Sequence, residues 1–208
     1  MLRYHFSFSM FCDIILRGDE LMSFETSLND LNTYLEQDAK DIINILNTYK
    51  TSRITTKTSI SLNAYDCVVP FTVDPVKKTK ANKDLTKKRG NYIFVMTSSY
   101  TRQKDFNNVY SGAPLKDSSI SVFNKDDILY VGTAKSLLSR MHQHFKKDDK
   151  YDHTGSLKLG ADERKTINGS FVVYAFCIKD KYKDYYSIIG PKVEKYLHEN
   201  LNVLVGND

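Results

Sequence analysis

The pattern of apolar and polar positions divides the chain into helix and strand candidates. Over residues 27–50, apolar side chains recur at steps of three, four and seven residues, which places them on one face of a helix. Ser27 can cap the first backbone N–H groups of this segment, and Asp30 lies in its first turn. The segment is therefore predicted to form an amphipathic helix. Its apolar face comprises Leu28, Leu31, Leu35, Ile42 and Leu46.

Two short strand candidates follow this helix. Residues 53–62 show the alternating side-chain pattern of a β-strand, and residues 67–73 form an apolar run that contains Pro70. Proline has no N–H to donate to a β-ladder, so we expect these strands at the periphery of a sheet. Together with the helix, they make up an N-terminal extension over residues 1–89.

The remaining part of the chain, residues 90–208, has a different pattern. Short runs of β-branched and aromatic residues predict three strands, and periodic segments predict two helices, the first capped by Thr133 and the second opened by Pro191. The polar segment 97–127 is interpreted as an insertion with one further strand candidate at 119–123. The expected fold class is α/β (α+β). Strands are expected at 91–96, 127–132 and 170–178, and helices at 134–147 and 191–201.

Composition narrows the class of protein. Apolar residues make up 41% of the 208 residues, which is enough for a hydrophobic core. The three cysteines, Cys12, Cys67 and Cys177, show no disulfide framework and no zinc-binding spacing, which indicates a reducing compartment. We therefore expect a cytoplasmic protein.

The N-terminal segment does not have the pattern of a targeting sequence. Its apolar residues are interrupted by His5 and Asp13, so it fits neither a signal peptide nor a membrane span. We expect no membrane partner. Met22 directly precedes the predicted helix, and translation from Met22 is an alternative to translation from Met1.

Positive charge is concentrated in one segment. The chain carries a net charge of +5, whereas residues 77–89 contain seven basic residues and one acidic residue, a net +6 that leaves −1 for the rest. Such a run is either a solvated linker or a strap that contacts phosphates and releases counterions. Its candidate DNA-binding residues are Lys77, Lys78, Lys80, Lys83, Lys87, Lys88 and Arg89.

Residues whose side chains could take part in catalysis lie on and around the predicted helix 134–147. Arg140 and His144 lie four residues apart beside its apolar face, so they can meet at one site. A solvated helix surface would also account for this pair alone. The surrounding order is more specific: G-N-Y at residues 90–92 starts one strand, Y-V-G at residues 130–132 ends the next, and Glu194 follows on the last helix.

This ordered set of residues resembles the GIY-YIG nuclease family. The two triplets match the motifs that give the family its name, and the resemblance extends from Gly90 to the C-terminus. It implies a small three-stranded antiparallel sheet flanked by helices, on which the motif residues converge. It also implies an endonuclease that hydrolyses DNA phosphodiester bonds with a single divalent metal, Mg²⁺ or Mn²⁺.

The resemblance assigns a catalytic role to each matching residue. Tyr92 would activate the attacking water and His144 would take its proton. Arg140 would bind the scissile phosphate with a forked donor, and Tyr130 would hydrogen-bond the phosphate or the water. Glu194 would be the metal ligand. Supporting positions would be Gly90, Gly132, Lys135 and Asn207, with Asn202 as a second choice for the asparagine that follows the glutamate helix in the family.

The chain departs from the family in the long interval between its two triplets. This insertion and the N-terminal extension make the chain similar to compact type II restriction endonucleases of the family, in which added segments bind DNA around a small catalytic core. We therefore expect duplex DNA as the partner. Cutting both strands would require a homodimer or two sequential nicks.

Several functions fit the sequence. The first is a metal-dependent endonuclease in restriction or defence, and a structure-selective repair or recombination nuclease is a variant of it. A catalytically inactive nucleic-acid-binding module is the alternative from a different class. An interaction protein with a chance motif would show no salt-sensitive DNA binding. The presence of all five candidate residues favours a nuclease.

Overall fold

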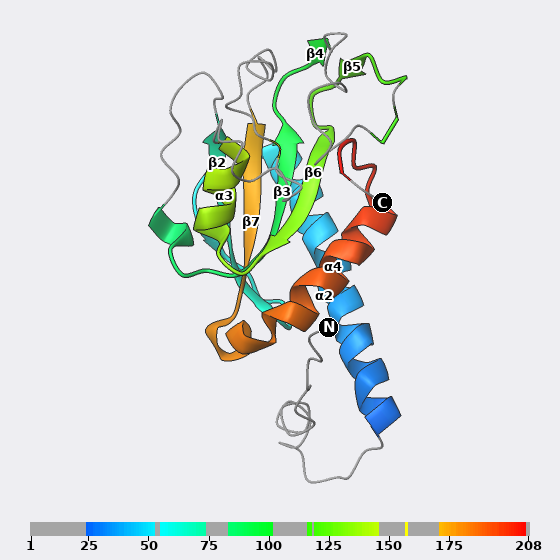
Figure 1. The fold of residues 1–208 in the computed structure, drawn as a ribbon, viewed down its shortest axis with the longest axis vertical. Coiled ribbons are helices and arrows are strands. Elements are labelled where there is room, and N and C mark those ends of the chain that lie inside the picture. The colour runs from blue at the N-terminus through cyan, green and yellow to red at the C-terminus, as the bar shows by residue number, and fades with distance from the viewer. Residues whose placement is uncertain are drawn as a thin grey trace, which may run out of the picture.

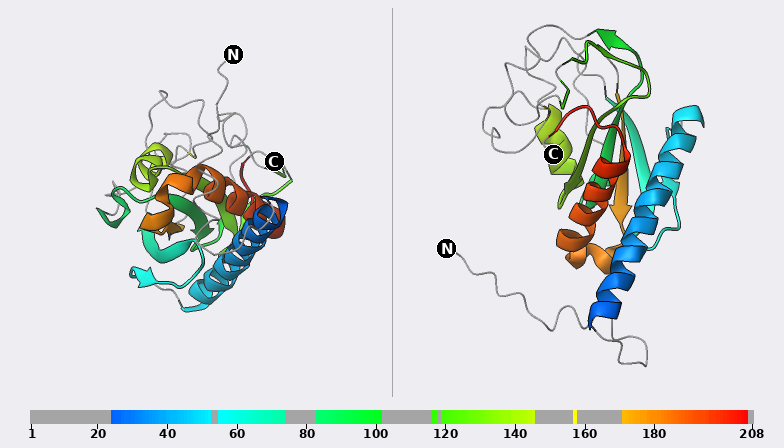
Figure 2. Two further views of the ribbon diagram at one scale, coloured as in Figure 1. Left: turned by 90° about the horizontal axis from the view of Figure 1, so that it is seen from below. Right: turned by 90° about the vertical axis from the view of Figure 1, so that its right-hand side faces the viewer.

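The computed structural model describes residues 24–52, 55–73, 83–101, 116–117, 119–145, 157 and 171–206. These residues form an α+β fold in which helices lie on both sides of an antiparallel sheet (Figures 1 and 2). The alternative start at Met22 lies outside the described residues. Among the described helices, none has both the length and the apolar composition to cross a bilayer.

The main sheet has five strands in the order β1-β2-β7-β3-β6. The expected three strands β7, β3 and β6 are present, but the expectation of a three-stranded sheet is wrong. The N-terminal extension supplies β2, which pairs with β7 from Tyr65 opposite Ile178 to Val73 opposite Phe171. The bounds are β1 Thr58–Ser59, β2 Tyr65–Val73, β3 Gly90–Met96, β6 Ile128–Ala134 and β7 Phe171–Ile178.

The two strands from the extension lie at one side of the sheet, as their sequence indicated. β1 pairs with β2 only opposite Cys67 and Val68, and Pro70 lies farther along β2, opposite Tyr174 of β7. The ladder to β1 therefore ends before Pro70. This position suits a residue that has no N–H to donate.

Each face of the sheet carries its own apolar cluster. α3, Leu137–Phe145, packs with Tyr92 and Phe94 on one face. Ile93 and Val95 alternate with them and face the other side, where they pack with α2 and α4. Figure 2 shows α2 and α3 on opposite sides of the sheet.

Helix α2, Phe24–Ser52, confirms the predicted amphipathic helix and extends it by three residues at the start and two at the end. Its buried side chains include Leu35, Ile42 and Leu46, which recur at helical spacing. Asp38 is buried on the same face and accepts hydrogen bonds from the backbone N–H groups of Asn63 and Ala64, both at 2.7 Å. These bonds fix α2 to the turn before β2.

The expected start of the helix after β6 is wrong. Thr133 does not cap α3 but lies in β6, and its hydroxyl donates to the carbonyl of Gly90 at 3.2 Å. Instead, the Ser136 hydroxyl accepts the N–H of Ser139 at 3.4 Å, and the helix starts at Leu137. Continued pairing of β6 with β3 keeps Thr133 in the strand.

The expected start of the last helix is also wrong. α4 spans Tyr186–Asn200, and Pro191 lies inside it rather than at its first position. Pro191 is exposed, so the carbonyl that loses its helical donor lies at the solvent side. The short 3₁₀ helix η3, Asp180–Tyr185, leads from β7 into α4.

The insertion between the two triplets is described only at its ends. β4, Tyr100–Thr101, pairs with β5, Val122–Phe123, in a separate two-stranded sheet. The strand expected at 119–123 is thus two residues long. A further 3₁₀ helix, η1 at Lys83–Leu85, precedes β3.

Candidate active site

The hydroxyl of Tyr92 is the centre of the candidate site. His144 Nε2 lies 2.9 Å from this oxygen, and Arg140 Nε donates to it at 3.1 Å. Tyr92 comes from β3, whereas Arg140 and His144 come from consecutive turns of α3. The i, i+4 spacing of the arginine and the histidine therefore brings both side chains to one phenol oxygen, as the sequence predicted.

The hydrogen bonds of His144 determine which of its nitrogens carries the proton. The backbone N–H of Leu157 donates to Nδ1 at 2.9 Å, so Nδ1 must supply a lone pair. In a neutral imidazole the proton then lies on Nε2, which donates to Tyr92. In this arrangement His144 is a donor to Tyr92, and not the proton acceptor expected from the resemblance.

His144 is held in an aromatic environment. Its ring centroid lies 5.3 Å from that of Tyr92, 5.1 Å from that of Phe94 and 5.2 Å from that of Tyr130. Its side chain has no exposed surface. Burial, and then the positive charge of Arg140, hold the pKa of His144 well below its ordinary value, so the imidazole is neutral.

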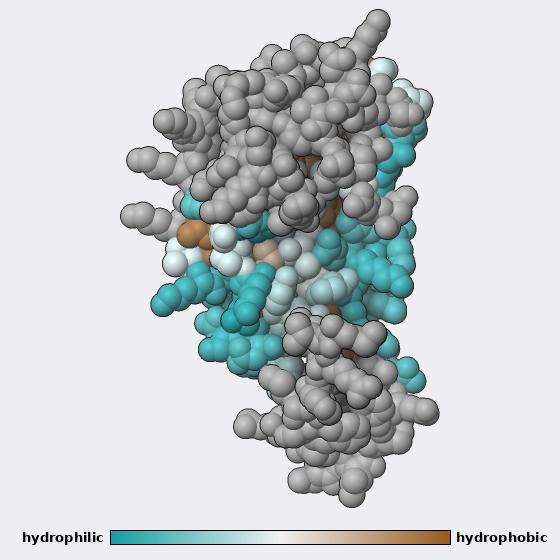
Figure 3. Space-filling model, viewed as in Figure 1, coloured by the Kyte–Doolittle hydropathy of each residue, from teal (hydrophilic) through white to brown (hydrophobic). Residues whose placement is uncertain are grey.

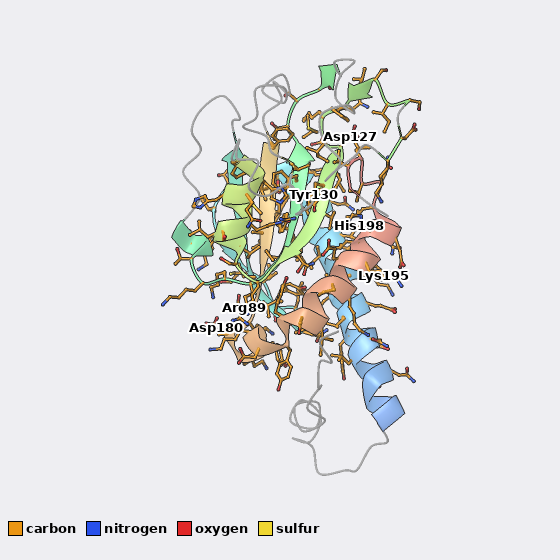
Figure 4. The ribbon with its side chains drawn as sticks, in the orientation of Figure 1. Arg89, Asp127, Tyr130, Asp180, Lys195 and His198 are labelled. Atoms are coloured by element: carbon orange, nitrogen blue, oxygen red, sulfur yellow. The ribbon has the colours of Figure 1, made fainter. Side chains whose placement is uncertain are left out.

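Tyr130 joins the group from β6, the strand next to β3. Its ring stacks on that of Tyr92 with centroids 6.0 Å apart, and its hydroxyl shares a hydrogen bond with Arg140. Burial raises the pKa of both phenols, that of Tyr92 most strongly. Both tyrosines are therefore neutral in the free protein. Figure 4 shows Tyr130 on the sheet and His198 on α4 to one side of it.

Glu194 reaches the group from α4, on the other layer of the fold. Burial raises the pKa of its carboxyl to about 7, and the positive charge of Arg140 opposes this shift. The same carboxylate acts electrostatically on both Tyr92 and Tyr130. The structure thus brings Tyr92, Tyr130, Arg140 and His144 into contact, and Glu194 lies near enough to interact electrostatically with them.

The donor set fits one hard divalent cation. Among the residues that the structure describes, no three His, Cys, Asp or Glu side chains come together, which does not match a structural zinc site. Mg²⁺ commonly takes one or two carboxylates and completes its octahedron with waters and substrate phosphates. Glu194, with its side chain 26% exposed, can provide such a carboxylate.

The glycines of the two triplets allow two different close approaches. A Cβ atom on Gly132 would lie 2.4 Å from the Tyr92 hydroxyl, so only glycine leaves room for that side chain. Gly90 has φ of +152°, and a Cβ there would lie 1.9 Å from the carbonyl oxygen of Phe176. Gly132 thus leaves room for the Tyr92 side chain, and Gly90 allows the close approach of β3 to β7.

Of the other supporting candidates, Lys135 and Asn202 are not part of this group. Lys135 is exposed on the turn between β6 and α3. Asn202 is exposed after the end of α4, and Asn207 lies outside the described residues.

The basic run is described only at its C-terminal end. Lys88 and Arg89 pair with Asp180 and Asp184 of η3 at 3.4 and 3.6 Å, so their charges are partly compensated within the chain. Lys87 is exposed. Lys77, Lys78 and Lys80 lie outside the described residues, as does the side chain of Lys83. Figure 3 shows a mainly hydrophilic surface over α4 and η3.

Two contributors to the site were not predicted from the sequence. His198 lies one turn after Glu194, with 4.0 Å between Nε2 and the nearer carboxylate oxygen, and its i, i+4 spacing is a signal that could have identified it. The backbone N–H of Leu157 sets the tautomer of His144. No side-chain pattern marks a backbone donor, so this contact is visible only in the tertiary structure.

Comparison with protein-family models, curated proteins and solved structures found no match for this chain.

Proposed function

We propose that the protein is a divalent-metal-dependent endonuclease that hydrolyses DNA phosphodiester bonds, as the GIY-YIG nucleases that its motifs resemble do. One observation carries the proposal: His144 and Arg140 bond to the hydroxyl of Tyr92, Tyr130 stacks beside it, and Glu194 interacts electrostatically with this group from a fourth element. The burial or packing of each residue taken alone does not explain why these five polar side chains lie near one another. A role in restriction or defence is the biological context that we infer.

Tyr92 would act as the base in its ionised form. Burial keeps the phenol neutral in the free protein, so its proton would first have to pass to solvent. Its oxygen accepts hydrogen bonds from His144 and Arg140, and these two donors would stabilise the phenolate once it has formed. A phenolate at this place can take the proton of an attacking water. His144 would hold and stabilise this oxygen through Nε2–H, while its other nitrogen stays fixed by Leu157.

Arg140 would bind the scissile phosphate. Its guanidinium is half-buried and bonds to Tyr92 and Gln143 through different nitrogens, so its plane is fixed in the site. A fixed guanidinium stabilises the negative charge that grows on the phosphate oxygens in the transition state. Tyr130 would orient the phosphate beside it.

Glu194 would hold the cation next to this phosphate. A bound Mg²⁺ would polarise the phosphate and stabilise the leaving oxygen. A carboxyl with a pKa of about 7 is largely protonated in mildly acidic solution, so proton and metal compete for it.

The burial of Tyr92 adds a requirement to the proposal. Tyr92 has no exposed surface and Tyr130 has 8%, so Arg140 and Glu194 form the accessible side of the group. Substrate binding must therefore open a path for water to the phenol. The same burial also favours the alternative function, a nucleic-acid-binding module without hydrolysis.

Duplex DNA is the proposed substrate, and the basic run over residues 77–89 is the proposed source of phosphate contacts. Cleavage of both strands would follow from a homodimer or from two sequential nicks.

The test is cleavage of supercoiled plasmid and of mixed genomic DNA with Mg²⁺ or Mn²⁺, beside an EDTA control. Glu194→Ala should abolish cleavage, whereas Glu199→Ala, on an exposed site of the same helix, should leave it unchanged. Discrete fragments would support sequence-specific restriction, and random nicks would support a nonspecific or structure-selective nuclease. If the DNA stays intact but is retarded in a salt-dependent way, the result would contradict the endonuclease proposal and support the nucleic-acid-binding module.

A further inference from the structure

Asn91 lies in the middle of the first triplet, and its amide is completely buried. It alternates with Tyr92 along β3, so its side chain points to the opposite face of the sheet, toward α4. A buried amide is unfavourable unless its polar atoms have partners. The partners of Asn91 are therefore informative about its role.

Both ends of the Asn91 amide are engaged. Its Oδ1 accepts a hydrogen bond from the hydroxyl of Tyr65 on β2 at 2.5 Å, and its Nδ2 donates to the carbonyl of Gly190 on α4 at 3.0 Å. Tyr65 also has no exposed surface. The three residues thus form a buried chain of hydrogen bonds from the extension, through the centre of the sheet, to α4.

The acceptor at the end of this chain, the carbonyl of Gly190, lies one helical turn before Glu194, the candidate metal ligand. In an α-helix the carbonyl of residue 190 accepts the N–H of residue 194, so the Asn91 amide binds the same carbonyl that starts the turn of Glu194. The helix backbone also touches the sheet here, since a Cβ on Gly190 would lie 2.3 Å from the Thr133 hydroxyl. α4 therefore has a fixed point four residues before Glu194. Figure 1 shows this helix beside the sheet.

We infer that Asn91, oriented by Tyr65, is a positioning residue that sets the place of α4 along the sheet and thereby holds Glu194 at the site of Tyr92 and Arg140. The chain of hydrogen bonds gives β2 a function: it supplies the phenol that fixes the Asn91 amide. The part of this inference that concerns the cation rests on the proposed function, whereas the placement of Glu194 does not.

The experiment separates placement from stability with two variants. Asn91→Leu removes the amide and leaves the buried Tyr65 hydroxyl without this acceptor, so it should lower the melting temperature. Tyr65→Phe combined with Asn91→Leu removes both partners and should recover most of that loss, because matched apolar replacements leave no orphaned polar group. Asn200→Leu is the control, since the Asn200 amide also donates to a carbonyl of α4, at 2.9 Å, but on the exposed surface.

Two readouts follow the placement of Glu194. In both Asn91 variants the Mn²⁺ concentration for half-maximal cleavage should rise about tenfold, the usual effect of losing a residue that orients a ligand, while the Asn200 control keeps the wild-type value. Without metal, the carboxyl of Glu194, followed by ¹³C NMR, should titrate at lower pH in both variants because it becomes more solvated.

The double variant decides the inference. Wild-type metal dependence and wild-type Glu194 titration in a well-folded double variant would overturn it and leave Asn91 with a role in stability alone. If the wild-type protein does not cleave DNA at all, the endonuclease proposal fails, and the Glu194 titration still tests the positioning role.

Discussion

His144 Nε2 lies 2.9 Å from the hydroxyl oxygen of Tyr92, and the backbone of Leu157 fixes the imidazole so that this nitrogen is the donor. Arg140 donates to the same oxygen. The phenol oxygen is thus surrounded by positive partial charge in a buried place, where such interactions are stronger than in water. In the proposed reaction, this arrangement would stabilise a phenolate on Tyr92.

His144→Ala should reduce cleavage by about 10²–10³-fold, as expected for loss of one preorganised donor. It should also lower the free energy of unfolding by about 2–4 kcal/mol, because it leaves a cavity among aromatic rings and removes the acceptor of Leu157 N–H. Plasmid cleavage and urea denaturation measure the two effects. His142→Ala, at an exposed position of the same helix, is the control. Equal effects of the two substitutions would contradict the role of His144.

The low pKa of His144 and the raised pKa of Glu194 together predict a single transition in the pH profile of cleavage. Cleavage and Mn²⁺ binding should both increase as the pH rises through about 7, where Glu194 loses its proton. His144 should add no second transition to the pH profile near pH 7, because its pKa lies well below the ordinary value. Activity measured from pH 5.5 to 8.5 at several metal concentrations tests this. A midpoint that does not move toward lower pH at higher metal concentration would argue against metal binding by Glu194.

The raised pKa of Glu194 also predicts a stability difference in the absence of metal. The folded protein holds this proton more tightly than the unfolded chain does, so the stability contribution is complete below pH about 4.5, the ordinary pKa, and is lost as the pH rises through 7. Glu194→Gln has no such titration and should become more stable than wild type by up to about 3 kcal/mol at pH 8. Urea denaturation in EDTA at pH 4.5 and pH 8 measures the difference. A difference that is the same at both pH values would be inconsistent with a buried, ionised Glu194.

Gly132→Ala should disturb the site by contact alone. The new methyl group would meet the hydroxyl of Tyr92 at 2.4 Å and the ring of Tyr130 at 2.9 Å, and neither buried ring can move freely. We expect a loss of about 1–3 kcal/mol in the free energy of unfolding, typical of overpacking, together with a loss of cleavage. Wild-type stability and activity in this variant would show that the packing around Tyr92 is looser than described.

The basic run should act through salt-sensitive phosphate contacts. Replacing Lys77, Lys78 and Lys80 with Ala should weaken DNA retardation and reduce the slope of log affinity against log salt by about 0.9 for each lost phosphate contact. Lys195→Ala, on an exposed site of α4, is the control. An unchanged salt slope in the triple variant would support the solvated-linker interpretation.

Some features of the protein follow from local sequence alone. The helical spacing of Leu35, Ile42 and Leu46 predicted α2, because a helix buries one face whatever covers it. The strands of the C-terminal part were likewise predicted from their apolar runs. The spacing of Arg140 and His144 fixed their common direction, since residues four apart share a helix face.

Other features depend on partners distant in sequence, which a local pattern does not specify. The pairing of β2 with β7 joins residues about a hundred positions apart, and together with the pairing of β1 with β2 it turned the expected three-stranded sheet into a five-stranded one. Pro191 lies inside α4 although prolines favour the first helical turn, because its ring faces solvent there. Nothing in the local pattern distinguishes Asn91 from other strand residues, because its hydrogen-bond partners, Tyr65 and Gly190, are distant in the sequence.

The sequence by itself determined the five candidate site residues and the local element on which most of them lie. The tertiary structure decided how they meet: a backbone N–H of Leu157 made His144 a donor, and the packing of α4 brought Glu194 to Arg140. The physical reason is that periodicity is a property of neighbouring residues, whereas hydrogen-bond partners, desolvation and pKa values depend on groups that only folding brings together.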